Sequence, residues 1–194
     1  MAITKLNNKA VANITTLPVA LGDMVLVSSA TASSSASIEF TLGNYKEYQF
    51  YFVNIHASAN KILEFQVSTD NGSSYGVAIT STAFDAGHAE NDTFTIFEYQ
   101  VDSDLAQSTS YQNLIRQIGT DNDNSAVGIL QIFNPSSSVY VKHFLSRFNT
   151  AVSYTIEQHI GGYINSTSPI NSIKFQMSDG ATIDSGKILM FGIN

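Results

Sequence analysis

The chain has 194 residues, of which 13% are charged and 43% hydrophobic, and it contains no cysteine. The formal net charge is −7, and phosphate binding requires a basic surface. We therefore expect no nucleic-acid partner. Without cysteine, disulfide bonds, thiolate catalysis and cysteine-ligated zinc are excluded. The low charge leaves a surface of hydroxyl and amide groups, which is typical of an exposed, assembly-forming protein and equally of an ordinary β-rich domain.

Residues 1–23 differ from the rest of the chain in charge. Lys5 and Lys9 are the only charged residues before Asp23, so residues 1–22 carry +2 and the remainder must carry −9 to give the total of −7. A disordered leader is one interpretation, but apolar residues are too frequent for a segment that stays in water. We therefore predict an extended arm that docks on an acidic partner. The residues expected to make this contact are Ile3, Lys5, Leu6, Lys9, Val11, Ile14 and Leu17.

The most apolar stretch near the N-terminus, residues 17–27, is interrupted by Pro18, Gly22 and Asp23. It is too short to cross a bilayer or to form the apolar part of a signal peptide. We expect neither membrane insertion nor an export signal.

From Met24 onward the chain is a succession of short runs that alternate apolar and polar residues, with turn signals such as Asn71-Gly72 between them. We expect strands at 24–29, 36–42, 47–56, 62–69, 93–101, 126–134, 139–148, 153–164, 172–178 and 187–193. Residues 82–92 are expected to form a loop, and residues 104–119 fit a helix or a strand. The pattern predicts one all-β domain over 24–194, an antiparallel two-sheet sandwich of jelly-roll type.

Five aromatic residues crowd the strand expected at 47–56 and the turn before it. Successive side chains of a strand face opposite ways, so these rings cannot all lie on one side. Core packing is the favoured interpretation, and a platform for stacking sugars is the alternative, although the chain has no tryptophan. The residues concerned are Tyr45, Tyr48, Phe50, Tyr51 and Phe52.

Signals for catalysis and for metal binding are weak throughout the chain. The four histidines lack the spacing that places two imidazoles on one metal ion. Asp121, Asp123 and Ser125 begin with the spacing of a calcium loop, but the glycine and glutamate of such a loop do not follow, so a hydrophilic hairpin loop is favoured over a calcium site. No nucleophile elbow is present. We expect no enzymatic activity and no cofactor.

The last strand, 187–193, contains five apolar residues in seven positions, with Lys187 and Gly192 as the exceptions. A run of this kind predicts a strand that is covered on both faces, by neighbouring structure or by another subunit.

The chain resembles a group of tailed-bacteriophage virion proteins common in marine phages. The resemblance extends from about Val25 to Asn194 and is carried by residues 52–76, 125–144 and 161–194. Its clearest part is a C-terminal motif, in which Met190 stands where leucine is more usual. The matching residues are Ile183, Ser185, Gly186, Ile188, Met190, Phe191, Gly192 and Ile193.

The resemblance implies a β-sandwich or jelly-roll module that assembles as a homotrimer on the particle exterior, without catalytic residues. The leading hypothesis is a head-decoration protein, a cement or head-fibre protein, that binds capsid proteins through its arm. The alternative is a tail-fibre or tail-accessory adhesin that contacts a host-surface glycan or protein. The absence of heptads and repeats in the sequence argues mildly against a complete fibre.

Overall fold

The computed structural model describes residues 24–194, which form strands and connecting segments without an α-helix. One short 3-10 turn, Ser178–Gly180, precedes the last strand. The strands are β1 (Val25–Thr31), β2 (Ser37–Thr41), β3 (Glu47–Ala57), β4 (Leu63–Ser68), β5 (Ile79–Ala89), β6 (Thr95–Tyr99), β7 (Gln112–Asn113), β8 (Ser125–Phe133), β9 (Lys142–Ala151), β10 (Tyr154–Ile164), β11 (Ser172–Met177) and β12 (Ile183–Ile193). The predicted all-β class is confirmed.

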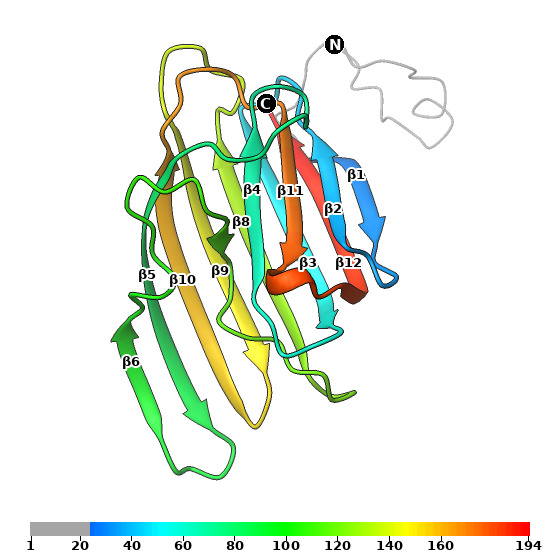
Figure 1. Cartoon of the computed structure of the whole chain (residues 1–194), viewed down its shortest axis with the longest axis vertical. Helices are drawn as coiled ribbons and strands as arrows, with labels where there is room; N and C mark the ends of the chain where they lie inside the picture. Colours follow the sequence, from blue (N-terminus) through cyan, green and yellow to red (C-terminus); the bar gives the residue numbers. More distant parts are fainter. Residues whose placement is uncertain (1–23) are drawn as a thin grey trace, which may run out of the picture.

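The strands form two antiparallel sheets packed face to face (Figure 1). The large sheet has the order β1-β12-β3-β8-β9-β10-β5-β6, and the small sheet has the order β2-β11-β4-β7. The first four strands of the large sheet and the four of the small sheet follow the strand order of a jelly roll. Four further strands, β9, β10, β5 and β6, extend the large sheet beyond β8. The predicted sandwich is thus confirmed for the described residues.

The core lies between the sheets and is rich in aromatic side chains. Phe175 of β11 packs edge-on against Phe50 and Phe52 of β3, with ring centroids 5.3 and 5.0 Å apart. Tyr48 lies on the same inward face of β3 and is fully buried, whereas Tyr51 points to the opposite face. The favoured interpretation of the crowded aromatic residues, core packing, is confirmed for the three inward rings.

Strand β12 lies inside the large sheet, between β1 and β3. Ile188 and Met190 on its inner face are buried, but Leu189 and Phe191 on its outer face are only half-buried. The described chain therefore covers one face of this strand and not both. Burial of the second face by another subunit stays a prediction.

The prediction of a loop at 82–92 is wrong. Most of this segment belongs to β5, which pairs with β10 on one side and with β6 on the other. Its inward residues include Ser81, Ala83 and Asp85. Small and polar side chains at inward positions hide the period-two alternation on which strand assignment depends.

Residues 104–119 do not form the helix that their apolar spacing allowed. They run across the sandwich as an irregular segment that contains β7, and their backbone bonds to neighbouring strands. The Leu114 amide donates to the Leu63 carbonyl over 2.8 Å, and the Ser81 amide donates to the Leu105 carbonyl over 2.9 Å. Tertiary hydrogen bonds replace those that a helix would have made within itself. Within residues 24–194 no helix is long and apolar enough to cross a membrane.

Candidate functional site

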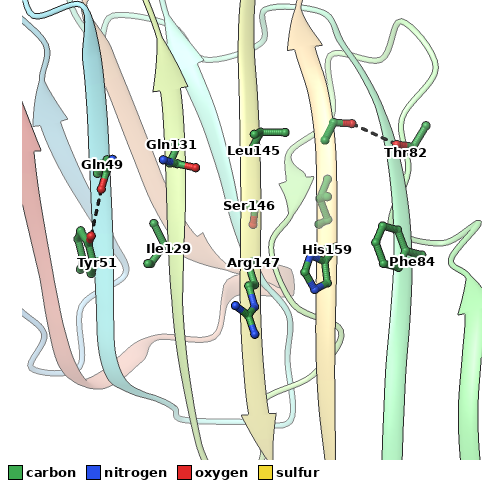
Figure 2. Close-up of a pocket in the computed structure, with 12 residues that line it drawn as sticks. Gln49, Tyr51, Thr82, Phe84, Ile129, Gln131, Leu145, Ser146, Arg147 and His159 are labelled. Carbon is green, nitrogen blue, oxygen red and sulfur yellow. Dashed lines mark hydrogen bonds between the residues drawn. The ribbon is translucent and has the colours of Figure 1, made fainter. Parts of the chain in front are cut away.

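The outer face of the large sheet, which points away from the small sheet, contains a hollow of about 540 Å³ (Figure 2). Its lining comes from β3, β8, β9, β10 and β5, so the site rests on five hydrogen-bonded strands and not on loops. We call this feature the outer-face hollow. Its main side chains are Gln49, Tyr51, Thr82, Phe84, Ile129, Gln131, Leu145, Arg147 and His159.

Strand register arranges these side chains in two parallel rows. In an antiparallel sheet, residues directly opposite each other point to the same face, so a row is read across the strands from partner to partner. The first row runs Tyr51, Ile129, Arg147, His159 and Phe84. The second row runs Gln49, Gln131, Leu145, Gly161 and Thr82.

An aromatic pair stands at one end of the first row. The rings of Phe84 and His159 are parallel to within 1°, with centroids 5.0 Å apart. Phe84 is 41% exposed, so much of its ring is accessible to a ligand. The phenyl ring is the apolar part of this pair, and the imidazole stacked on it carries polar ring nitrogens.

A compact charged group lies beside this pair. Arg147 donates through Nε to Oε1 of Glu157, and Nε2 of His159 lies 3.1 Å from the same carboxylate oxygen. The hydrogen bond from Arg147 holds the pKa of Glu157 below its usual value, so this carboxylate is ionised at neutral pH. Its charge balances that of Arg147 locally.

At the opposite end of the hollow, a hydroxyl group and two amides form a hydrogen-bonded chain that ends on the carboxylate of Glu47. The hydroxyl of Tyr51 donates to Oε1 of Gln49 over 3.0 Å, and Nε2 of Gln49 donates to Oε1 of Glu47 over 2.6 Å. Nε2 of Gln131 donates to the same oxygen over 3.1 Å. These bonds fix the amide groups at defined positions on the outer face.

A second polar cluster lies on the inner face, beneath the segment 104–119. Asp85 is fully buried, with Oδ2 3.6 Å from Nη1 of Arg116, and the same nitrogen is 3.6 Å from Oε1 of Glu98. Burial raises the pKa of Asp85 to about 6, against the opposing effect of Arg116. This buried side chain lies directly across from Gln158 of β10.

The seven residues predicted to dock the arm lie outside the described residues: Ile3, Lys5, Leu6, Lys9, Val11, Ile14 and Leu17. The structure therefore leaves that prediction untested.

The loop that contains Asp121 and Asp123 lies just before β8, with both side chains exposed. The carbonyl of Asp121 accepts from the Asn124 amide over 2.9 Å, which closes a tight turn. Across residues 24–194, no three or more histidine, cysteine or acidic side chains are grouped as metal ligands. Glu90 lines the same surface hollow as Asp121 and Asp123, but the three do not form such a group.

Sequence reasoning missed the outer-face hollow. Its first row joins residues between 51 and 159, and no short motif marks such a set. Only the pairing of the strands brings these residues together.

No family model matches the chain, and no curated protein shows significant similarity to it.

Proposed function

We propose that this protein is a non-enzymatic structural component of a phage virion, a head-decoration protein that assembles as a homotrimer on the particle exterior. The observation that carries the proposal is the apolar edge of the large sheet. Met24, which precedes β1, and the first three residues of that strand, Val25, Leu26 and Val27, are between 40 and 52% exposed.

Among residues 24–194, strand β1 lies at the edge of the large sheet and pairs with β12 alone. No other described strand pairs with the second edge of β1, and soluble monomers normally protect such an edge with charges, prolines or bulges. The pairing of β1 with β12 does shift register between Leu26 and Ser28. Four consecutive exposed apolar residues without a charge or a proline nevertheless favour contact with another chain. A second copy is the proposed occupant, since identical chains usually associate with closed cyclic symmetry. The number three comes from the resemblance to phage virion proteins.

The proposed self-association is tested by replacing Leu26 with lysine and measuring molar mass by size exclusion with light scattering. We expect the wild-type chain to be a trimer and Leu26→Lys to dissociate, because the new charge would be desolvated in the contact. Val139→Lys is the matched control, since Val139 is 65% exposed in the loop between β8 and β9. A monomeric wild-type protein would contradict the proposal.

We further propose that residues 1–23 attach the trimer to capsid proteins. Full burial of one aliphatic side chain contributes about 1.5–3 kcal/mol, so the five apolar residues of the proposed contact would dominate it. The two lysines would mainly orient the approach.

The test is co-sedimentation of a 1–20 deletion variant with particles that lack the protein. We expect the deletion to leave a folded trimer that no longer attaches. Replacing Lys5 and Lys9 together should weaken attachment modestly and reduce its salt dependence. Full decoration of particles by the truncated chain would show that the arm is not the anchor.

A second candidate function is a tail-fibre or tail-accessory adhesin that binds a host-surface glycan or protein. The observation that favours it is the outer-face hollow, which an inert decoration protein does not require. Antibody-gold labelling of virions separates the two candidates by placing the protein on the head or on the tail.

A further inference from the structure

We propose that the outer-face hollow is a binding site for a neutral oligosaccharide. The inference deepens the adhesin function and rests on it for its biological role. Binding itself is a property of the sandwich and does not depend on where the protein sits on a particle.

The form of the hollow suits a small ligand. Its volume of about 540 Å³ falls in the range of roughly 300–1,000 Å³ that is typical of small-molecule sites. Gly161 lies within the second row, between Leu145 and Thr82, and leaves that position without a side chain. A Cβ atom at Gly161 would lie 3.4 Å from Leu145, an ordinary contact, so the space above this glycine is open to a ligand.

The apolar part of the hollow matches one face of a sugar ring. A pyranose presents C–H groups on its faces and hydroxyl groups around its rim. The face of an aromatic ring is electron-rich and attracts the weakly positive hydrogens of C–H groups. The ring of Phe84, which is 41% exposed and stacks on His159, supplies such a surface, and the half-buried ring of Tyr51 supplies another at the far end of the row.

The polar part matches the rim hydroxyls. Arg147 is 69% exposed at its side chain and uses Nε for Glu157, so its terminal Nη groups can reach a ligand. The amides of Gln49 and Gln131 are held in place through Glu47. Hydroxyl groups both donate and accept hydrogen bonds, so they can match amides, a guanidinium group and a carboxylate together.

The balance of charge excludes other ligand classes. A phosphate or sulfate would need a free cation, but Glu157 already neutralises Arg147, and Glu47 adds a further negative charge. A purely apolar ligand would desolvate the amides and the guanidinium group without giving them partners. A neutral polyhydroxyl compound satisfies both the rings and the polar groups.

The experiment uses the purified full-length protein and saturation-transfer NMR. The probes are the trisaccharides maltotriose, cellotriose, mannotriose, galactotriose and chitotriose, with sialyllactose as the anionic comparison. We expect at least one neutral trisaccharide to bind, with the strongest saturation on the C–H protons of one ring. Phe84→Ala and Arg147→Ala should each weaken its binding by about tenfold or more.

Two further variants separate the site from general damage to the fold. Gly161→Val fills the hollow without removing a contact group and should also abolish binding. Tyr140→Ala is the matched aromatic control, since Tyr140 is 70% exposed in the loop between β8 and β9, and it should bind normally. Thermal melts of all four variants must show an intact fold before their affinities are compared.

Three results would overturn the proposal. The first is the absence of binding by every neutral trisaccharide. The second is binding of sialyllactose alone, lost as salt is added, which would indicate an anion site. The third is a change of oligomeric mass in Phe84→Ala or Arg147→Ala together with a lack of sugar binding, which would make the hollow a contact between copies. None of these results bears on whether the arm attaches the protein to virions.

Discussion

Gly161 and Gly162 are adjacent in β10 but face opposite sides of the large sheet. A Cβ atom at Gly162 would lie 2.5 Å from the Thr80 carbonyl oxygen and 2.9 Å from the buried ring of Phe144. Gly161 has no such neighbour, since its nearest contact would be Leu145 at 3.4 Å. Packing of the core therefore requires a glycine at position 162, whereas Gly161 leaves room in the outer-face hollow.

We predict that Gly162→Ala lowers the free energy of unfolding by about 1–3 kcal/mol, because the core must shift to admit the methyl group. The matched variant Gly161→Ala should remain close to the wild-type value. Urea denaturation followed by circular dichroism measures both. Equal losses in the two variants would show that strand propensity, and not packing, determines the effect.

Asp85 is a fully buried carboxyl group at an inward position of β5. Its pKa of about 6 is above the usual value for aspartate, so the folded state binds more protons than the unfolded state between about pH 4 and pH 6. Its contribution to stability is thus fully present below pH 4 and is lost as the pH rises through 6. At neutral pH the ionised, buried group costs the fold on the order of 3 kcal/mol.

We predict that Asp85→Asn raises the melting temperature by several degrees at pH 7.5 and changes it little at pH 4, since about 2–4 °C corresponds to 1 kcal/mol in a chain of this size. Differential scanning fluorimetry from pH 4 to pH 8 measures the difference between variant and wild type. Asp123→Asn, in the exposed loop before β8, is the control and should give no such trend. A variant less stable than wild type at pH 7.5 would show that the contact with Arg116 outweighs the cost of burial.

At the scale of an element, β12 shows how one strand divides its side chains between two environments. Ile188 and Met190 complete the core, whereas Leu189 and Phe191 lie on the outer face, where Phe191 packs on Tyr51 with ring centroids 5.5 Å apart. Because β12 joins β1 to β3, the sheet depends on this C-terminal strand for both pairings.

We predict that Ile188→Ala lowers the free energy of unfolding by about 2–5 kcal/mol, because it opens a cavity in a closed core. Leu189→Ala should cost clearly less, since the wild-type side chain is only half-buried. Chemical denaturation of both variants provides the comparison. A loss at Leu189 as large as that at Ile188 would indicate that a second subunit covers the outer face.

At the scale of the whole molecule, the two sheets share one core. Phe65 of the small sheet packs on Phe144 of β9, so that core reaches beyond the jelly-roll strands into the extension of the large sheet.

We predict that millimolar EDTA leaves the melting temperature and the oligomeric mass unchanged. A ligand that binds only the folded state raises its stability, so removal of a structural ion would lower the melting temperature. Differential scanning fluorimetry with and without EDTA, followed by addition of calcium, is the measurement. A drop that calcium restores would identify the loop at 121–125 as a calcium site.

The sequence by itself determined the class of fold and several details within it. Alternation of apolar and polar residues is a local property, so it placed most strands. The distinct composition of residues 1–23 and the apolar final strand were also visible without a structure.

Only the tertiary structure decided which residues meet. Strand β5 escaped prediction because its inward positions carry Ser81, Ala83 and Asp85, and the segment 104–119 took its form from hydrogen bonds to distant strands. The outer-face hollow depends on the register of four strand pairs, and each register depends on contacts between residues far apart in the chain. A local pattern determines which face a side chain takes, but the partner across the sheet is set by packing of the whole core.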